Sequence, residues 1–305
     1  MNTMKAIIKQ KNGVFLKDIP KPTPGPSDIL VKVAVVGYCR TDGYVAQNKI
    51  QSKKLPLVLG HEFYGTIEAC GKKVKNFKKG DRVAIMPIMK DSHGHYSGPM
   101  LGVEHDGAFA EYVITPAASV HIIPATMTFR EAAYLEPVTA SLAVLKAPIK
   151  KDQRGLILGK NRIAVLTQRI LTIHGFQKAK LFTQTELGSI RANSYDYAIE
   201  TLITTDTLTE LIRVVRPGGL IILKSRQYTP IELSVASVVR KDIRLFGTYY
   251  GDFEKSIRLI AHKKLKVSDI FGATLSLHEA LKILKGPLDT FEEKKMFFDP
   301  SLCVE

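Results

Sequence analysis

The chain has 305 residues, of which 45% are hydrophobic and 24% charged, so its composition is that of an ordinary globular protein. This composition excludes collagen-like, low-complexity and disulfide-scaffold classes, and the length allows two domains with their own cores. The formal net charge of +15 raises the question of an anionic partner, such as nucleic acid, an anionic membrane or a phosphorylated ligand.

The first 125 residues predict short strands separated by turns. Apolar or alternating runs at 4–10, 29–39 and 82–88 are rich in β-branched residues, and a Pro/Gly loop occupies 20–28. Because no helical period separates these runs, they favour an antiparallel barrel or sandwich.

The pattern changes at about residue 128. Residues 128–147 have helical spacing, with a bend expected at Pro137. Strand and helix patterns then alternate from 155 to 224, which is typical of a doubly wound parallel sheet. The remaining chain predicts two helices and a last short strand, at 252–264, 277–284 and 294–299.

A nucleotide site is indicated by GLILGKNRIA at 155–164, where a strand leads into a helix. A dinucleotide fingerprint has three glycines at such a turn. Here Gly159 supplies the first, Asn161 replaces the second, and Ala164 is a tolerated substitute for the third. Lys160 and Arg162 at the helix N-terminus would help to hold an anion.

The acidic residue that binds ribose hydroxyls is missing at the end of the next strand, where Thr183 and Gln184 stand. The absence of that carboxylate mildly favours NADP over NAD, although no arginine follows directly to bind a 2′-phosphate. The fingerprint alone therefore leaves open a domain that keeps the shape of this fold and binds no nucleotide.

A second constellation joins Cys39, His61, Glu62 and Glu136. Cysteine, histidine and carboxylate are the ligands of catalytic zinc sites that keep one position open. Taken singly, each residue has an ordinary structural explanation: a small buried thiol, a satisfied core histidine or an exposed helix carboxylate.

The order of motifs along the chain resembles the zinc-dependent medium-chain dehydrogenase/reductase family, which includes alcohol, threonine and polyol dehydrogenases. The resemblance covers nearly the whole sequence and rests on GPSDILVKV, GYCRTD, LPLVLGHEFYGTIEACG, GDRVAI, DGAFAEYV, EPVTASLAVLK, YDYAIET, VVRPGGLIIL and RKDIRLFGTYY. It implies a GroES-like antiparallel β-barrel catalytic domain over 1–136 and 251–305. It also implies a shortened Rossmann-type, doubly wound parallel-sheet domain that binds the cofactor over 137–250.

By the same resemblance, Cys39 and His61 are zinc ligands. Glu136 fills the fourth place, and Glu62 is a direct ligand or a partner that exchanges with water. Thr41 matches the hydroxyl residue that takes the substrate proton. Zinc would lower the pKa of a bound alcohol, and hydride would pass to NADP or NAD.

Several features depart from the family pattern. The cysteines of a structural zinc lobe are absent from 86–105, so we expect no structural zinc, and we interpret His93, His95 and His105 as surface residues. Tyr44 occupies the place of a relay histidine. About a dozen residues separate the second and third predicted strands of the cofactor domain, so we expect one strand–helix unit to be lost.

The functional prediction is a zinc-dependent dehydrogenase of a polyol or sugar-like alcohol. The alternatives are a family-derived binding protein without dinucleotide turnover and a zinc-free reductase.

Lysine pairs are scattered along the chain and do not interleave with aromatic residues, so we expect no nucleic-acid partner. No apolar run reaches the length of a membrane span or signal peptide. We therefore expect a cytoplasmic homodimer with a small-molecule substrate.

Overall fold

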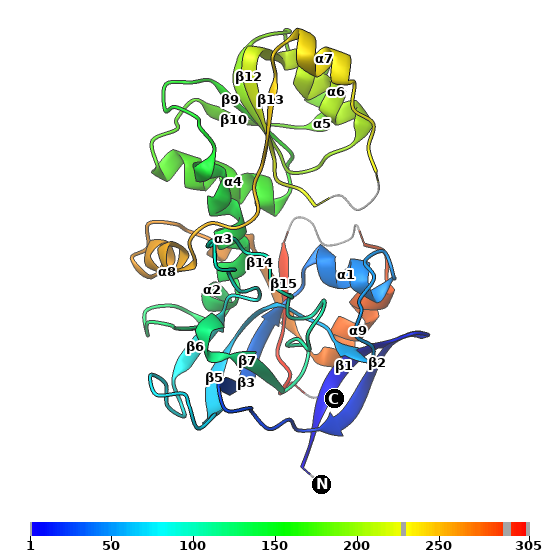
Figure 1. Ribbon diagram of the computed structural model, residues 1–305, viewed down its shortest axis with the longest axis vertical. Coiled ribbons are helices and arrows are strands. Elements are labelled where there is room, and N and C mark those ends of the chain that lie inside the picture. Colours follow the sequence, from blue (N-terminus) through cyan, green and yellow to red (C-terminus); the bar gives the residue numbers. More distant parts are fainter. Residues whose placement is uncertain (1, 227–229, 289–293, 303–305) are drawn as a thin grey trace. The chain divides into compact units, whose positions relative to one another are not determined.

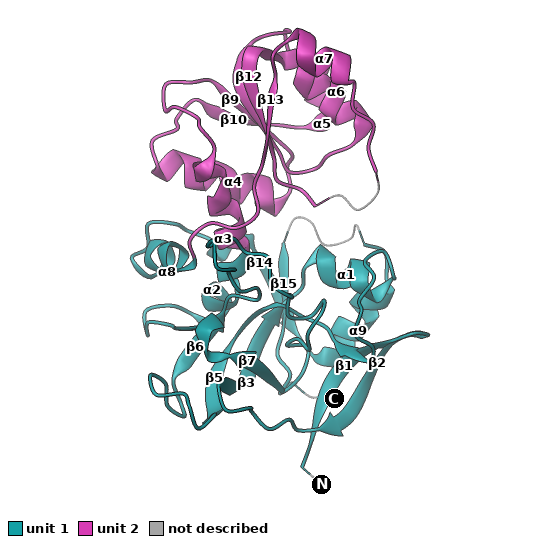
Figure 2. Cartoon of the chain, viewed as in Figure 1, with its two compact units in different colours: residues 1–136, 253–305 teal, residues 137–252 magenta. Residues whose placement is uncertain are grey.

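The computed structural model describes residues 2–226, 230–288 and 294–302. The chain divides into two compact units, which Figure 2 colours separately. Unit 1 comprises Met1–Glu136 and Phe253–Glu305, and unit 2 comprises Pro137–Asp252. A catalytic role for the first range and a cofactor-binding role for the second stay predictions. Within the described ranges, no helix is long and apolar enough to cross a membrane.

Unit 1 is built mainly from antiparallel strands (Figure 1). A three-stranded sheet has the order β2-β1-β4, and a larger sheet has the order β14-β15-β3-β5-β6-β8, with β7 also paired to β3. Branched side chains such as Val31, Ile67 and Val83 are fully buried in its core. The strands are β1 (Thr3–Gln10), β2 (Gly13–Pro20), β3 (Asp28–Gly37), β4 (Leu57–Val58), β5 (Glu62–Cys70), β6 (Arg82–Ile85), β7 (Tyr112–Pro116), β8 (Val120–Ile122), β14 (Phe271–Leu275) and β15 (Lys295–Phe298).

The helical segment that follows β8 is interrupted earlier than the sequence predicts. Thr128 caps α2 (Phe129–Ala133), and the Glu131 carboxylate accepts from the Thr128 backbone N–H at 2.8 Å. The segment then restarts as α3 (Leu135–Leu142), so Pro137 lies in a first turn, where its missing N–H leaves no helical bond unmade. Only the first two residues of α3 belong to unit 1, and the rest of the helix begins unit 2. Besides α2, the helices of unit 1 are α1 (Arg40–Ala46), α8 (Phe253–Ala261), α9 (Leu277–Lys285) and the short 3-10 helices Ala117–Ser119 and Ser268–Ile270.

Unit 2 contains a parallel sheet of the order β10-β9-β11-β12-β13. Numbered within the unit, this order is 2-1-3-4-5, whereas a full dinucleotide fold has six strands in the order 3-2-1-4-5-6. The strand outside β10 is therefore missing among the described residues, in agreement with the expected shortening. The strands are β9 (Gly155–Leu158), β10 (Ala179–Phe182), β11 (Tyr195–Glu200), β12 (Val215–Leu223) and β13 (Arg244–Gly247).

Both faces of this sheet are covered, which explains why its strands are apolar without interruption. Leu156 and Leu158 point to the face that α5 and α6 cover, and Ile157 points to the face of α4. The helices of unit 2 are α4 (Arg162–Ile173), α5 (Gln184–Leu187), α6 (Thr205–Val214), α7 (Val235–Arg240) and the 3-10 helix Ala143–Lys146.

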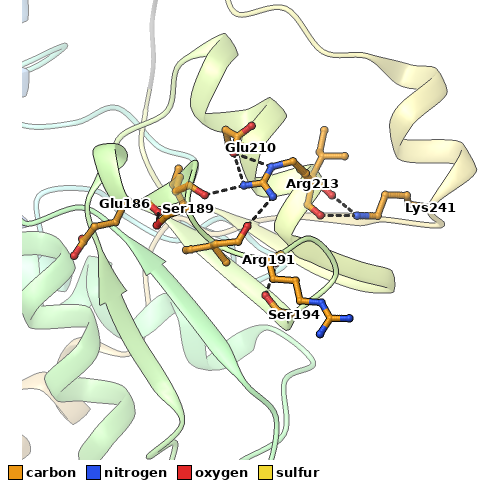
Figure 3. Close-up of polar contacts among 10 residues, drawn as sticks. Glu186, Ser189, Arg191, Ser194, Glu210, Arg213 and Lys241 are labelled. Atoms are coloured by element: carbon orange, nitrogen blue, oxygen red, sulfur yellow. Dashed lines mark hydrogen bonds and ion pairs between the residues drawn. The ribbon is translucent and has the colours of Figure 1, made fainter.

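The crossover from β10 to β11 spans only residues 183–194, and Arg213 of α6 holds it in place (Figure 3). Its guanidinium donates to the carbonyl oxygens of Leu187 at 2.8 Å and Ile190 at 2.7 Å, and it pairs with Glu210. Nearby, the Lys241 ammonium donates to carbonyls at the end of α6. Arg213 thus satisfies carbonyl groups of the short crossover, and Lys241 satisfies carbonyl groups at the C-terminus of α6.

Candidate metal centre and dinucleotide site

Three potential metal ligands meet in unit 1. Cys39 is the N-cap of α1 and follows β3, and His61 and Glu62 lie where β5 begins. The antiparallel pairing of β3 with β5 sets Gly37 opposite Glu62, so the ends of the two strands come together. One potential ligand atom from each of Cys39, His61 and Glu62 lies within 4.8 Å of the other two. The chain thus collects a thiol, an imidazole and a carboxylate from two strand ends.

Asp42 orients two of these three residues. One of its carboxylate oxygens lies 2.9 Å from His61 Nδ1, and the other accepts from the Cys39 backbone N–H at 2.9 Å. His61 Nε2 is buried and has no hydrogen-bond partner among the described residues. In zinc proteins, a histidine that binds the metal through one ring nitrogen usually bonds a carboxylate or another acceptor through the second. The donor set and the unpartnered nitrogen therefore fit a zinc ion.

Lys295 of β15 enters the same site from the far end of the sequence. It is fully buried, and its ammonium donates to the Tyr38 carbonyl oxygen at 2.6 Å and to a Glu62 carboxylate oxygen. A Cβ atom on Gly37 would lie 2.6 Å from Lys295 Cε and 3.2 Å from that oxygen. Glycine at this position makes room for the ion pair.

The site's charges determine its protonation. Burial alone would raise the pKa of the Cys39 thiol, but the charges of His61 and Lys295 outweigh it and lower that pKa to about 6. Burial favours neutral His61, yet the charges of Asp42 and Cys39 raise its pKa well above the usual range. Burial also raises the pKa of Glu62, against the attraction of Lys295. At neutral pH Cys39 is therefore a thiolate, the form that binds zinc.

We expect zinc binding to weaken as the pH falls through about 6, because protonation of Cys39 removes the thiolate ligand. Since the folded-state pKa lies below the ordinary value of 9.0, the thiolate's contribution to the stability of the fold grows as the pH rises from about 6 towards 9 and is lost as the pH falls through about 6. In the metal-free wild type, the ultraviolet absorbance of the thiolate should rise in a step near pH 6. This step should be absent from the Cys39→Ser variant. The pKa of Cys70 is raised, by burial and by Asp81, so a single step only at high pH would contradict the prediction.

The other predicted residues of the metal site lie around this group. Glu136 is buried in the first turn of α3, and its charge acts on Glu62, but it lies outside the compact group of three. Thr41 and Tyr44 are half-buried on α1, in the turns that follow Cys39. Their roles in proton transfer stay predictions.

In unit 2, the turn from β9 to α4 is filled by the chain's own side chains. Gly159 has φ +126°, and a Cβ there would lie 2.5 Å from Thr201 Oγ1. Asn161 caps α4, and its Oδ1 accepts from the backbone N–H groups of Ile163 and Ala164, each at 3.0 Å. The helix N-terminus predicted to receive a phosphate thus already bonds a side-chain oxygen.

A carboxylate lies near the end of β10, although the sequence has no acidic residue at the position where the dinucleotide fingerprint places one. Thr183 caps α5, and Glu186 folds back so that its carboxylate accepts from the Thr183 N–H and hydroxyl, both at 2.6 Å. These bonds lower the pKa of Glu186, and the charge of Lys160 acts in the same direction. Lys160 and Arg162 flank Asn161, so positive and negative groups both occur at this end of the sheet.

Residues 86–105, which lack the cysteines of a structural zinc site, include a hydrogen-bonded loop around Asp91. The Asp91 carboxylate accepts from the N–H groups of His93 and His95, and from the Ser97 hydroxyl. His93, His95 and His105 are exposed. Across the described ranges, the group around Cys39 is the one cluster of three potential metal ligands.

Comparisons with known proteins agree with this arrangement. The family described as "Alcohol dehydrogenase GroES-like domain" matches residues 25–125. Sorbitol dehydrogenase of Halalkalibacterium halodurans is 26% identical over 94% of this chain and 100% of its own length. A Sinorhizobium meliloti 1021 protein bound to NADP has a TM-score of 0.89 at 23% identity, over 98% of this chain and 100% of that one. The cobalt- and zinc-bound thermostable alcohol dehydrogenase of Pyrobaculum aerophilum has a TM-score of 0.84 at 19% identity, with coverages of 98% and 100%.

Residues 25–125 match the GroES-like domain of alcohol dehydrogenases, and the relatives named as sorbitol and xylulose dehydrogenases or reductases support a zinc-dependent medium-chain dehydrogenase/reductase family for the chain. The predicted family and the two-domain fold class are confirmed. The prediction of a nicotinamide-linked oxidoreductase is likewise supported over the binding-protein alternative.

Three residues of these sites were not predicted from the sequence. Asp42 could have been found, because a carboxylate three residues after a candidate ligand is well placed to support it. Glu186 also has a local signal, the Thr-x-x-Glu pattern of a capping box. Lys295 has none, because 233 positions separate it from Glu62.

Proposed function

We propose that this chain is a zinc-dependent, NAD(P)-linked dehydrogenase of alcohols, and that polyols are its substrate class. The observation that carries the proposal is the group of half-buried Cys39 with buried His61 and Glu62, in which His61 Nε2 has no partner among the described residues and Nδ1 is held by Asp42. The named activity of the sorbitol dehydrogenase relative supports a polyol.

Cys39 and His61 would hold the zinc together with one carboxylate. Glu62 and Glu136 are the two candidates for that carboxylate: Glu62 belongs to the compact group but is paired with Lys295, and Glu136 approaches from α3. Lys295 would retain Glu62 whenever the carboxylate is not bound to the metal. The absence of a structural zinc is also proposed, since the loop around Asp91 is closed by hydrogen bonds in place of cysteine ligands.

The chemistry divides between the bound groups and the protein. Zinc would polarise the substrate oxygen, and the nicotinamide would exchange hydride with the substrate carbon. Asp42 keeps His61 in the required ring orientation. Thr41 would take the hydroxyl proton of the substrate, and Tyr44, on the next turn of α1, would pass it towards solvent.

The experiment titrates purified full-length protein with NADH and with NADPH, following nicotinamide fluorescence, and measures zinc on the same sample. We expect saturable binding of at least one cofactor and oxidation of polyols such as sorbitol. Glu186 would repel a 2′-phosphate and Lys160 would attract it, so we propose that either cofactor is accepted. Failure of both to bind at millimolar concentration would contradict a dehydrogenase and leave the binding-protein alternative.

We also propose a homodimer formed through unit 2. Its edge strand β13 and helix α7 expose apolar side chains: Val235 is 65% exposed, Val239 70% and Leu245 38%. Exposed apolar groups on an unpaired sheet edge are typical of an association surface. A monomeric mass in light scattering at micromolar concentration would contradict this proposal.

The cytoplasm is the proposed location. Cys39 and Cys70 are free thiols, and Cys39 must stay reduced to bind zinc, which favours a reducing compartment. Cell fractionation that recovered the protein in an oxidising compartment would contradict it.

A further inference from the structure

The side chain of Asn161 takes up the hydrogen-bond donors with which a dinucleotide-binding turn holds its ligand. In that turn, backbone N–H groups at the helix N-terminus point at the pyrophosphate. Here Asn161 Oδ1 accepts from two of them, Ile163 N–H and Ala164 N–H, at 3.0 Å each. Asn161 stands at the second glycine position of the fingerprint, where the backbone would otherwise approach the phosphates.

The asparagine is held in this position by a chain of hydrogen bonds between two strand ends. Its Nδ2 donates to Thr201 Oγ1 at 3.0 Å, and the Thr201 hydroxyl donates to the Leu158 carbonyl oxygen at 2.7 Å. Thr201 Oγ1 has given its only proton to Leu158, so it can only accept from Asn161. A side chain that accepts at one end and donates at the other is required, and an aspartate would not meet this requirement.

The turn itself is adapted to this network. Thr201 is 9% exposed, and its Oγ1 occupies the space in which a Cβ on Gly159 would lie, at 2.5 Å. Asn161 Nδ2 lies 3.1 Å from the same Cβ position. Gly159 is therefore needed for the asparagine network as well as for the turn.

We propose that Asn161 is an internal competitor of the cofactor pyrophosphate and thereby sets the cofactor affinity of this chain. The inference rests on the proposed function. A dinucleotide gains the N–H groups of Ile163 and Ala164 only after the Asn161 side chain rotates away and gives up its bonds to α4 and Thr201. Every pyrophosphate-containing ligand carries this cost, and a nucleoside without phosphate does not.

The test measures dissociation constants for NADH, ADP-ribose and adenosine by calorimetry on full-length wild type and on Asn161→Gly. In the variant the ligand no longer has to displace the hydrogen bonds of the Asn161 side chain, each equivalent to roughly two- to tenfold in an equilibrium constant, so we expect NADH and ADP-ribose to bind about five- to tenfold more tightly. Adenosine affinity should not change. Glycine is itself an acceptable N-cap, so the fold should be retained, and unfolding without ligand checks this.

Three further variants sharpen the result. Thr201→Val removes the acceptor for Asn161 Nδ2 and should tighten NADH binding by a smaller factor. Asn161→Asp keeps the cap oxygen and adds a negative charge beside the phosphates, so it should weaken NADH binding. Ser234→Gly is the matched control, because Ser234 caps α7 in the same unit through its side chain and should leave every affinity unchanged.

The possible outcomes separate this inference from the proposed function. Tighter NADH and ADP-ribose binding by Asn161→Gly, with adenosine unaffected, would support the competitor role. Wild-type binding that the variant leaves unchanged would overturn the inference and leave the dehydrogenase standing. If no variant and no wild-type sample bound NADH or NADPH, the proposed function would fail, and the inference with it.

Discussion

Replacing Cys39 by serine is expected to reduce bound zinc from about one ion per chain to almost none and to abolish alcohol oxidation. The thiolate is the strongest of the three candidate ligands and the one whose pKa the site lowers. A serine hydroxyl stays protonated at neutral pH and cannot replace it. Elemental analysis after dialysis, together with initial rates for sorbitol oxidation, measures both effects.

Cys70→Ser is the matched control for this variant. Cys70 is also a free thiol, but it lies at the far end of β5, where its sulfur is 3.6 Å from the Phe77 carbonyl oxygen. The zinc content and oxidation rates of Cys70→Ser should equal those of the wild type. Unchanged zinc content in Cys39→Ser, or an equal loss of zinc in both variants, would contradict the assignment of Cys39 as a zinc ligand.

Replacing Lys295 by methionine should lower the free energy of unfolding by about 3–5 kcal/mol, the usual effect of removing one partner of a buried ion pair. Both side chains are almost fully buried, and the Tyr38 carbonyl would lose its charged donor as well. Glu62 would then become protonated more readily, because the attraction that opposes its desolvation is gone. Urea unfolding of the metal-free protein measures the loss.

Two comparisons make the Lys295 prediction specific. Lys294→Met changes the neighbouring, exposed lysine and should alter stability by no more than about 0.5 kcal/mol. The double variant Lys295→Met/Glu62→Gln removes both charges and should recover part of the stability lost in the single variant. If Lys295→Met were as stable as Lys294→Met, the buried pair would have no role in holding Glu62.

Much of the fold could be predicted because it follows from local patterns. Uninterrupted apolar runs predicted the strands of unit 2, and their alternation with helical periods predicted a parallel sheet. The twelve residues of the 183–194 crossover are too few for a full strand–helix unit, and the sheet indeed ends at β10. The short helices α1 and α5 were not predicted, because one or two turns leave no periodicity to detect.

The sites were predicted less completely, for a different physical reason. Cys39, His61 and Glu62 lie in recognisable motifs, whereas Lys295 reaches Glu62 only through the pairing of β15 with β3. The sequence also indicated that Asn161 replaces the second glycine of the fingerprint. The hydrogen bonds of Asn161 to α4 and Thr201 depend on side-chain geometry, which the sequence alone does not specify.

The short crossover has a consequence for how the molecule avoids unwanted association. Among the described residues no strand lies outside β10, so this strand presents unpaired backbone groups that another chain could extend by β-augmentation. Two features discourage this: β10 is only four residues long, and the exposed Lys180 lies at its centre. The strand that the family normally places here has thus been replaced by a short, charged border.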